Sequence, residues 1–265
     1  MNFNQLLDAV QASPDGVCIP ATWAQGRAAF GGLMAAMVFQ AMRQKLSDNR
    51  PVRSLAISFV APAAPDVPTH FEVEVLREGK AVSTLLGRAV QGGQVVTLVQ
   101  GNFGAGRPSV VEVPALPAPA MKPLDQAAPE LPYIKGVTPE FMRHVALRWA
   151  IGGLPFSGNQ SRQMGGWVRL RDVAEEQVNE AHLLALVDAW PPSLMPFLKQ
   201  PAAGSTLTWT IEFIQPVAAL STLDWCRYCV ETEHAREGYG HAAATLWTAQ
   251  GELLALSRQT VTVFA

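Results

Sequence analysis

Residues 32–42 read Gly-Leu-Met-Ala-Ala-Met-Val-Phe-Gln-Ala-Met, a run that is apolar on nearly every side of a helix until Gln40. A helix that is apolar all round has to be enclosed. The apolar run from Phe30 to Phe39 is only about half of the ~20 residues that a membrane-spanning helix needs. The helix must therefore be surrounded by protein and not by lipid. The stretch predicts a central helix that other elements of the same fold enclose.

Alternating apolar and polar residues, typical of half-buried strands, follow this helix. The runs are Arg53–Val60, Thr69–Leu76, Ala81–Gln91 and Gln94–Phe103. A second helix-like segment, Asn179–Trp190, is followed in the same way by the runs Leu207–Ile214, Asp224–Thr232, Gly240–Ala249 and Glu252–Phe264. Each half of the chain thus predicts one helix and a curved antiparallel sheet around it, an α+β arrangement that occurs twice.

Two landmarks support a duplication. Phe59-Val-Ala-Pro62 matches Phe213-Ile-Gln-Pro216, and the hairpin turn Gln91-Gly-Gly-Gln94 matches Ala249-Gln-Gly-Glu252. Between the halves, Ala105–Pro139 holds eight of the chain's 20 prolines, which favour an extended segment over a helix or a central strand. We therefore expect an N-terminal unit over residues 1–104, a proline-rich linker over 105–139 and a C-terminal unit over 140–265.

Composition excludes several classes of protein. The chain has 265 residues, of which 49% are hydrophobic and 16% charged, so a disordered or fibrous protein is excluded. The formal net charge is -2 and there is no basic stripe, which argues against nucleic acid as a partner. Three cysteines do not make a disulfide framework. Without a signal-peptide pattern or a membrane-spanning run, we expect a soluble, cytoplasmic protein with no membrane partner.

A few polar positions could carry chemistry. Asp188 lies in the apolar run His182–Trp190, where an acid is rarely buried unless it is paired or used. Gln259 has an amide that could orient a water molecule. Gly31-Gly32 opens the first helix, where free backbone N–H groups could stabilise an oxyanion. Each of these positions also has an ordinary structural explanation.

Thr206, Thr208 and Thr210 alternate along one predicted strand, so period 2 places their side chains on a shared face. Other familiar motifs fail. There is no G-x-S-x-G nucleophile pattern, and Gly101–Gly106 is not a dinucleotide-binding loop. Cys226-Arg-Tyr-Cys229 has no second pair of ligands, and the five histidines are scattered, so we expect neither a metal nor a cofactor.

The assembled order resembles the double-hotdog acyl-CoA thioesterases of the acyl-CoA thioesterase II type. The resemblance rests on Phe30-Gly31-Gly32, on Ser54–Pro62 (SLAISFVAP), and on Glu74–Thr84 (EVLREGKAVST), which resembles the family pattern V-x-x-L-R-x-G-r-x-x-S/T. It covers most of the chain outside the linker. It implies a tandem (double) hotdog fold and hydrolysis of a fatty acyl-CoA to free acid and CoA. A homo-oligomer is also an expectation from the resemblance.

Family members use an Asp, a Thr or Ser, and a Gln of the second half to hold and activate a water. By position the acid and the amide are Asp188 and Gln259, and the hydroxyl is that of Thr206, with Thr208 and Thr210 as alternatives; the N–H of Gly32 would polarise the thioester carbonyl. The usual Asp-His-Ser stretch reads Thr208-Trp209-Thr210 here. Two alternatives therefore stay open: a non-catalytic module that binds acyl-CoA or fatty acyl groups, and a hotdog enoyl-CoA hydratase. Candidates for an acyl channel beside the helices are Met34, Met37, Phe39, Leu186 and Trp190.

Overall fold

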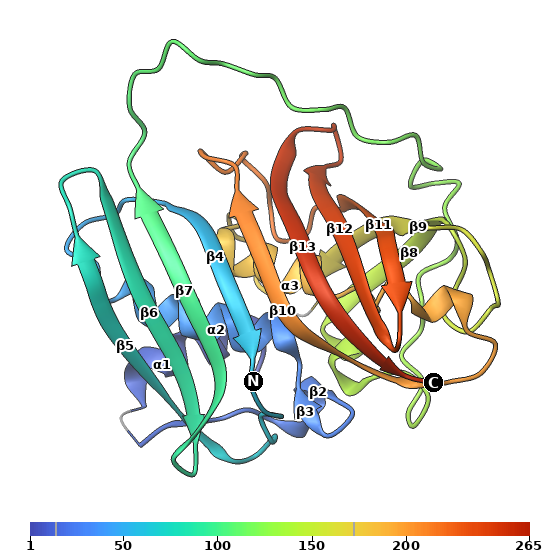
Figure 1. Cartoon of the computed structure of the whole chain (residues 1–265), viewed down its shortest axis with the longest axis horizontal. Coiled ribbons are helices and arrows are strands. Elements are labelled where there is room, and N and C mark those ends of the chain that lie inside the picture. The colour runs from blue at the N-terminus through green and yellow to red at the C-terminus, as the bar shows by residue number, and fades with distance from the viewer. Residues whose placement is uncertain (14, 172) are drawn as a thin grey trace.

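A computed structural model describes residues 1–13, 15–171 and 173–265. Its main feature is one antiparallel sheet of 11 strands in the order β1-β5-β6-β7-β4-β10-β13-β12-β11-β9-β8 (Figure 1). The strands of the first half are β1 (Val17–Cys18), β4 (Val52–Phe59), β5 (Pro68–Glu78), β6 (Val82–Gln91) and β7 (Gln94–Gly104). Those of the second half are β8 (Val145–Ile151), β9 (Gln163–Leu170), β10 (Ala203–Phe213), β11 (Cys226–Arg236), β12 (Tyr239–Thr248) and β13 (Leu253–Phe264). Two short strands, β2 (Ala24–Gln25) and β3 (Ala28–Ala29), form a separate pair.

Three α-helices lie on one side of this sheet, behind it in Figure 1. They are α1 (Phe3–Ala12), α2 (Gly31–Arg43) and α3 (Glu180–Asp188). Single 3₁₀ turns occur at Ala21–Trp23, Glu140–Arg143 and Met195–Phe197. Ten of the 13 residues of α2 are buried, which confirms the enclosed helix predicted from its all-round apolar character. The helix packs closely on the sheet: a Cβ atom on Gly87 of β6 would lie only 2.6 Å from Val38 Cγ1 of α2.

The eight predicted strand runs and both predicted helices are present, with ends shifted by a few residues. One feature was not predicted from the sequence. β4 pairs with β10, with Ile57 opposite Trp209, so the sheets of the two halves form one continuous surface. The elements α1, β8 and β9 were not predicted either. β9 contains Gly165-Gly166, and glycines weaken the strand signal.

Residues 105–139, all of which are described, contain no helix or strand. The segment runs across the outside of the molecule from β7 to β8 (Figure 1). Its second part covers the β8 edge of the sheet: the N–H of Ala128 donates to the Trp149 carbonyl, and that of Leu131 to the Leu147 carbonyl, both at 2.9 Å. The exposed edge of β8 is thereby protected from pairing with another chain.

Candidate active site

Asp188 is the last residue of α3, and it lies against the first turn of α2. A Cβ atom on Gly31 would lie 2.8 Å from Asp188 Oδ2, and one on Gly32 would lie 3.0 Å from Asp188 Cβ and from the Leu184 carbonyl oxygen. Only glycine allows the two helices to approach this closely. The carboxylate from the second half of the chain therefore meets the positive end of a helix from the first half.

Gln259 reaches the same carboxylate from the sheet. Its Nε2 donates to Asp188 Oδ1 at 3.0 Å. Gln259 faces inward on β13, where Trp209 of β10 lies directly opposite and is fully buried. The Trp209 Nε1 donates to Ser257 Oγ at 2.9 Å, and Ser257 lies two residues before Gln259 on the same face. The side chain of Gln259 thus lies beside the buried, hydrogen-bonded side chains of Trp209 and Ser257.

Burial raises the pKa of Asp188 to about 7, although the hydrogen bonds from Gln259 and from the Gly32 backbone N–H oppose the rise. From the sequence we expected an ionised carboxylate near neutral pH. Burial therefore disfavours the ionised form more than the sequence suggested. A carboxyl group whose pKa lies near the working pH can both accept and return a proton.

The Gly32 backbone N–H acts on the Asp188 carboxyl group and lowers its pKa, against the larger effect of burial. The first turn of a helix leaves several backbone N–H groups without an intrahelical acceptor. In α2 the amide of Gly31 is such a group, and a Cβ atom on this residue would lie 2.8 Å from Asp188 Oδ2.

The three threonines of β10 do not share a face, contrary to the expectation from period 2. A β-bulge lies between Thr206 and Thr208: Thr208 pairs with Thr260, whereas Thr206 pairs with Val261. Val261 is buried and lies on the inward face with Gln259, so Thr206 faces inward as well. Thr208 and Thr210 are exposed on the outer face. Of the three hydroxyl groups, only that of Thr206 is on the side of Asp188.

The sequence-predicted residues Asp188, Gln259, Gly31 and Gly32 are therefore brought together, and Thr206 lies on the same side of the sheet. Diagonal neighbours such as Thr206 and Gln259 are about 7–8 Å apart, which leaves room for a water molecule between the side chains. The proposed channel residues are packed into the main hydrophobic core; they are Met34, Met37, Phe39, Leu186 and Trp190.

One neighbour of the site was missed. A Cβ atom on Gly31 would lie 3.1 Å from the Phe59 ring, so this half-buried ring borders the carboxylate. The signal was the repeat of Phe59-Val-Ala-Pro62, which we used only as a landmark of the duplication.

The histidine nearest in sequence to Asp188 has another role. His182 Nδ1 accepts the Asn179 N–H at 3.0 Å, and His182 Nε2 is 2.9 Å from Asn4 Oδ1, so the ring links α3 to α1. Burial lowers the pKa of His182 to about 4, so it is neutral at pH 7. Among the described residues, no group of three or more His, Cys, Asp and Glu side chains is placed to hold a metal ion. No helix in the described ranges is long and apolar enough to cross a membrane.

Central helices enclosed by one curved antiparallel sheet, with the same order of elements in both halves, define a tandem hotdog protein. Two family models divide the chain between them. The acyl-CoA thioesterase N-terminal domain matches residues 19–104, and the acyl-CoA thioesterase C-terminal domain matches residues 115–263. The chain belongs to the acyl-CoA thioesterase family, whose members are thioester hydrolases.

Individual relatives and solved structures are similar to this chain. Acyl-CoA thioesterase 2 of Haemophilus influenzae is 24% identical over 253 residues, which cover 88% of this chain and 86% of the relative. Among solved structures, a hot dog fold protein from Alicyclobacillus acidocaldarius matches with a TM-score of 0.81 and 24% identity over 92% of this chain and 90% of its own. An acyl-CoA thioesterase II from Mycobacterium marinum matches with a TM-score of 0.67 and 20% identity over 89% of each chain.

Proposed function

We propose that this protein hydrolyses a fatty acyl-CoA thioester, using a water molecule held by Asp188, Gln259 and Thr206. The observation that carries the proposal is the 3.0 Å hydrogen bond from Gln259 to a partly buried carboxylate that also faces the first turn of α2. This arrangement brings a proton acceptor, an orienting amide and backbone N–H groups to one place. Those are the groups that attack of water on a carbonyl carbon requires.

In the proposed reaction, the ionised carboxylate of Asp188 accepts a proton from the water while the water oxygen bonds to the thioester carbonyl carbon. The Gly31 N–H, at the positive end of α2, stabilises the negative charge that develops on the carbonyl oxygen. The carbon–sulfur bond then breaks, and the departing sulfur takes the proton back from Asp188. The products are a free carboxylic acid and the CoA thiol, so atoms and charge balance.

The Gln259 carboxamide has two tasks in this scheme. One N–H holds Asp188 in a fixed rotamer, and its remaining donor and acceptor can orient the water. Thr206 supplies a second hydroxyl contact from the inward face of β10. The departure from the usual Asp-His-Ser stretch falls at Thr208, Trp209 and Thr210. It does not remove a hydroxyl from the site, because Thr208 and Thr210 are exposed on the opposite face.

The alternatives considered from the sequence are less well supported. A hydratase of the hotdog class needs an Asp/His pair, but both ring nitrogens of His182 are engaged by Asn179 and Asn4. A module that only binds acyl-CoA does not require a carboxylate held at a pKa of about 7 by burial. The buried acid costs folding free energy, and catalysis offers a reason for that cost.

Release of free thiol from a panel of acyl-CoA substrates tests the proposal. The parent should release thiol, and Asp188→Asn should lower kcat/KM by about 10²–10⁴-fold, the usual contribution of a general base. Asp125→Asn, an exposed acid in the linker, is the matched control and should behave like the parent. Hydration of an enoyl-CoA, or binding without thiol release by the parent, would contradict the proposal.

A further inference from the structure

The two oxygens of the Asp188 carboxylate have different neighbours. Oδ1 accepts the hydrogen bond from Gln259 Nε2 at 3.0 Å. Oδ2 lies on the side of Gly31, where a Cβ atom would be 2.8 Å from it. Within the described part of the chain, no side chain other than Gln259 donates a hydrogen bond to this carboxylate. Oδ2 is therefore the oxygen that is left to accept a proton from water in the proposed reaction.

An aromatic ring from the other half of the chain lies beside Oδ2. The same Cβ position on Gly31 is 3.1 Å from Cζ and 3.3 Å from Cε1 of Phe59. Phe59 is the last residue of β4, whereas Asp188 is the last residue of α3. Because one point is this close to both side chains, the ring edge and Oδ2 are no farther apart than the 2.8 and 3.1 Å placed end to end. The edge of the Phe59 ring therefore borders the carboxylate.

A second ring near Asp188 has a different position. A Cβ atom on Gly32 would lie 2.7 Å from Phe30 Cζ and 3.0 Å from Asp188 Cβ, so the Phe30 ring lies near the stem of the acid. Phe30 is fully buried and stacks on Phe141, with 4.2 Å between the ring centroids. Phe59, in contrast, is only half-buried. Of the two rings, Phe59 is the one that reaches both the carboxylate and the surface of the protein.

Charged side chains do not account for the state of the carboxylate. Burial raises the pKa of Asp188 to about 7, and the hydrogen bonds from Gln259 and from the Gly32 backbone lower it. The elements that surround the carboxylate are α2, α3, β4 and β13. Their other charged or titratable residues are Arg43 on α2, Glu180 and His182 on α3, Arg53 on β4, and Arg258 on β13. None of them is a cause of the raised pKa of Asp188.

The positions of these residues explain why they have no part in it. Arg43 ends α2, at the opposite end from Gly31, and Glu180 begins α3. Arg258 is exposed and pairs with Glu233. The remaining titratable neighbour is Tyr228 on β11: burial raises the pKa of its phenol, and the charge of Asp188 raises it further, so Tyr228 stays neutral. Removal of water by apolar neighbours is thus the main influence on Asp188.

We propose that Phe59 is a positioning residue whose ring keeps bulk water away from the oxygen of Asp188 that takes up the proton. The contact distances place an apolar edge where a hydration shell would otherwise surround Oδ2. Such surroundings disfavour the ionised carboxylate, and a less hydrated carboxylate is a stronger base. The inference rests on the proposed function. It adds that the first half of the chain controls the reactivity of an acid that the second half supplies.

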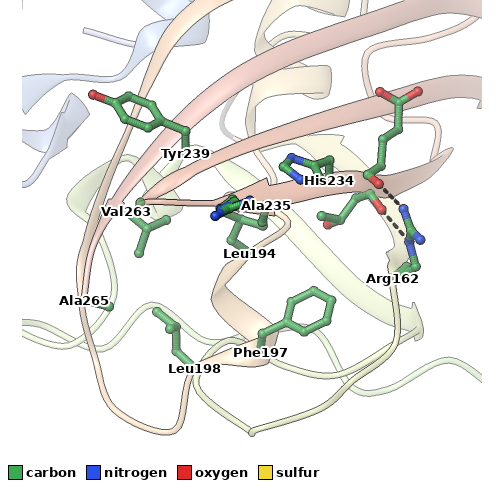
Figure 2. Close-up of a pocket in the computed structure, with 13 residues that line it drawn as sticks. Arg162, Leu194, Phe197, Leu198, His234, Ala235, Tyr239, Val263 and Ala265 are labelled. Atoms are coloured by element: carbon green, nitrogen blue, oxygen red, sulfur yellow. Dashed lines mark hydrogen bonds between the residues drawn. The ribbon is translucent and has the colours of Figure 1, made fainter.

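Three substitutions of Phe59 and one control test the inference. Phe59→Ala removes the ring, Phe59→Gln replaces it with a polar side chain, and Phe59→Leu keeps an apolar side chain in place. The control is Phe197→Ala, because Phe197 is also a half-buried phenylalanine. Figure 2 shows its ring beside a cavity of about 610 Å³, whose lining includes neither Asp188 nor Gln259. Circular dichroism of each variant shows whether it folds like the parent.

The first readout is the pH dependence of thiol release from an acyl-CoA. In Phe59→Ala and Phe59→Gln water reaches the carboxylate, so Asp188 ionises at lower pH than in the parent. The ratio of kcat/KM at about pH 5 to kcat/KM at about pH 8 should therefore rise by about tenfold in both variants. Phe59→Leu should stay within about twofold of the parent ratio, and Phe197→Ala should keep the parent ratio.

The second readout, urea unfolding, needs no substrate. The pKa of Asp188 is about 7 in the folded chain and near 3.8 in the unfolded chain, so the parent loses stability as the pH rises from about 4 to about 7. In Phe59→Ala and Phe59→Gln this loss should be smaller by about half. Lost packing lowers stability at every pH and does not change this dependence. Phe197→Ala should therefore show the same pH dependence as the parent.

The two readouts separate the failure of the inference from the failure of the proposed function. An unchanged pH dependence of stability in both Phe59→Ala and Phe59→Gln would overturn the inference, whatever the activity. An equal change in Phe197→Ala would also overturn it, since the effect would then not be specific to the ring beside Asp188. A parent that releases no thiol would refute the proposed function, while a reduced pH dependence of stability in the Phe59 variants would still support the shielding of Asp188.

Discussion

Asp188 and Gln259 are 71 residues apart in the chain, and a 3.0 Å hydrogen bond joins their side chains. One belongs to the end of a helix and the other to the middle of a strand, so only the folded sheet with α3 beneath it brings them together. Gly31 and Gly32 add a contribution from the other half of the duplicated fold. The proposed site is therefore composite, and neither half of the chain contains all of it.

Activity should rise with pH through the titration of Asp188. Because burial raises its pKa to about 7, kcat/KM should be low in acid, where the carboxyl group is protonated, and should reach a plateau above pH of about 8. Gln259→Ala removes a hydrogen bond that lowers this pKa, so the acid limb should move to higher pH. A pH series of kcat/KM for both proteins checks this. An unchanged limb in Gln259→Ala would show that the amide does not act on the carboxylate.

Gly31→Ala should lower kcat by more than any loss of folding stability explains. Its Cβ atom would lie 2.8 Å from Asp188 Oδ2, so the carboxylate must move. Displacement of a reacting group by about 1 Å can cost ~10²-fold in rate. Steady-state kinetics should show a fall in kcat, while Gly106→Ala, where the nearest atom is 4.0 Å away, should behave like the parent. Equal kcat for the two variants would place the reacting groups elsewhere.

The β-bulge predicts different outcomes for two neighbouring threonines. Thr206→Val removes a hydroxyl from the inward face, and the loss of one hydrogen bond to the water should lower kcat by up to about tenfold. Thr208→Val changes an exposed residue on the outer face and should leave kcat unchanged. Parallel kinetic measurements on the two valine variants are sufficient. A larger effect at Thr208 would mean that the register after the bulge is wrong.

Asp188→Asn should stabilise the fold at neutral and alkaline pH. The pKa of the carboxyl group is about 7 when folded and near 3.8 when unfolded, so the unfolded chain binds fewer protons between these values. The parent therefore loses stability as the pH rises from about 4 to about 7, whereas Asp188→Asn does not. Because the side chain keeps some solvent contact, we expect a difference of about 1–3 kcal/mol at pH 8.

Urea unfolding of both proteins measures this difference in the free energy of unfolding. The advantage of Asp188→Asn should shrink toward zero as the pH is lowered below about 4, because the parent carboxyl group then becomes protonated in the unfolded state as well. Asp125→Asn is again the control and should show no pH-dependent change. An Asp188→Asn variant less stable than the parent at pH 8 would indicate that the charge is well compensated in the fold.

Much of the fold could be predicted because local sequence patterns indicate most of its helices and strands. The almost uninterrupted apolar run of α2 predicts an enclosed helix. The alternation of apolar and polar residues up to Phe59 and up to Phe213 predicts strands. The pairing of β4 with β10 was not predictable, because the local sequence of a strand does not show which distant strand it pairs with. β8 and β9 were missed for a different reason, because glycines and a polar loop obscure their pattern.

Two residues of the proposed site, the acid Asp188 and the amide Gln259, could be selected from the sequence, but their geometry could not. Asp188 stood out as a charge within an apolar run, and the order of elements identified Gln259. The face of Thr206 could not be read correctly, since a bulge of one residue reverses the alternation without any mark in Thr206–Thr210. Gly32 lies beside Asp188 because α2 and α3 pack closely, and such tertiary packing could not be predicted from the sequence.

The most direct measurement is a double-substitution cycle of thiol release with the parent, Asp188→Asn, Gln259→Ala and the combined variant. If the two side chains act as one unit on the same water, the combined variant should be scarcely slower than Asp188→Asn alone, so that the effects are far from additive. Strictly additive losses, or full activity in either single variant, would contradict the assignment of this pair as the hydrolytic centre.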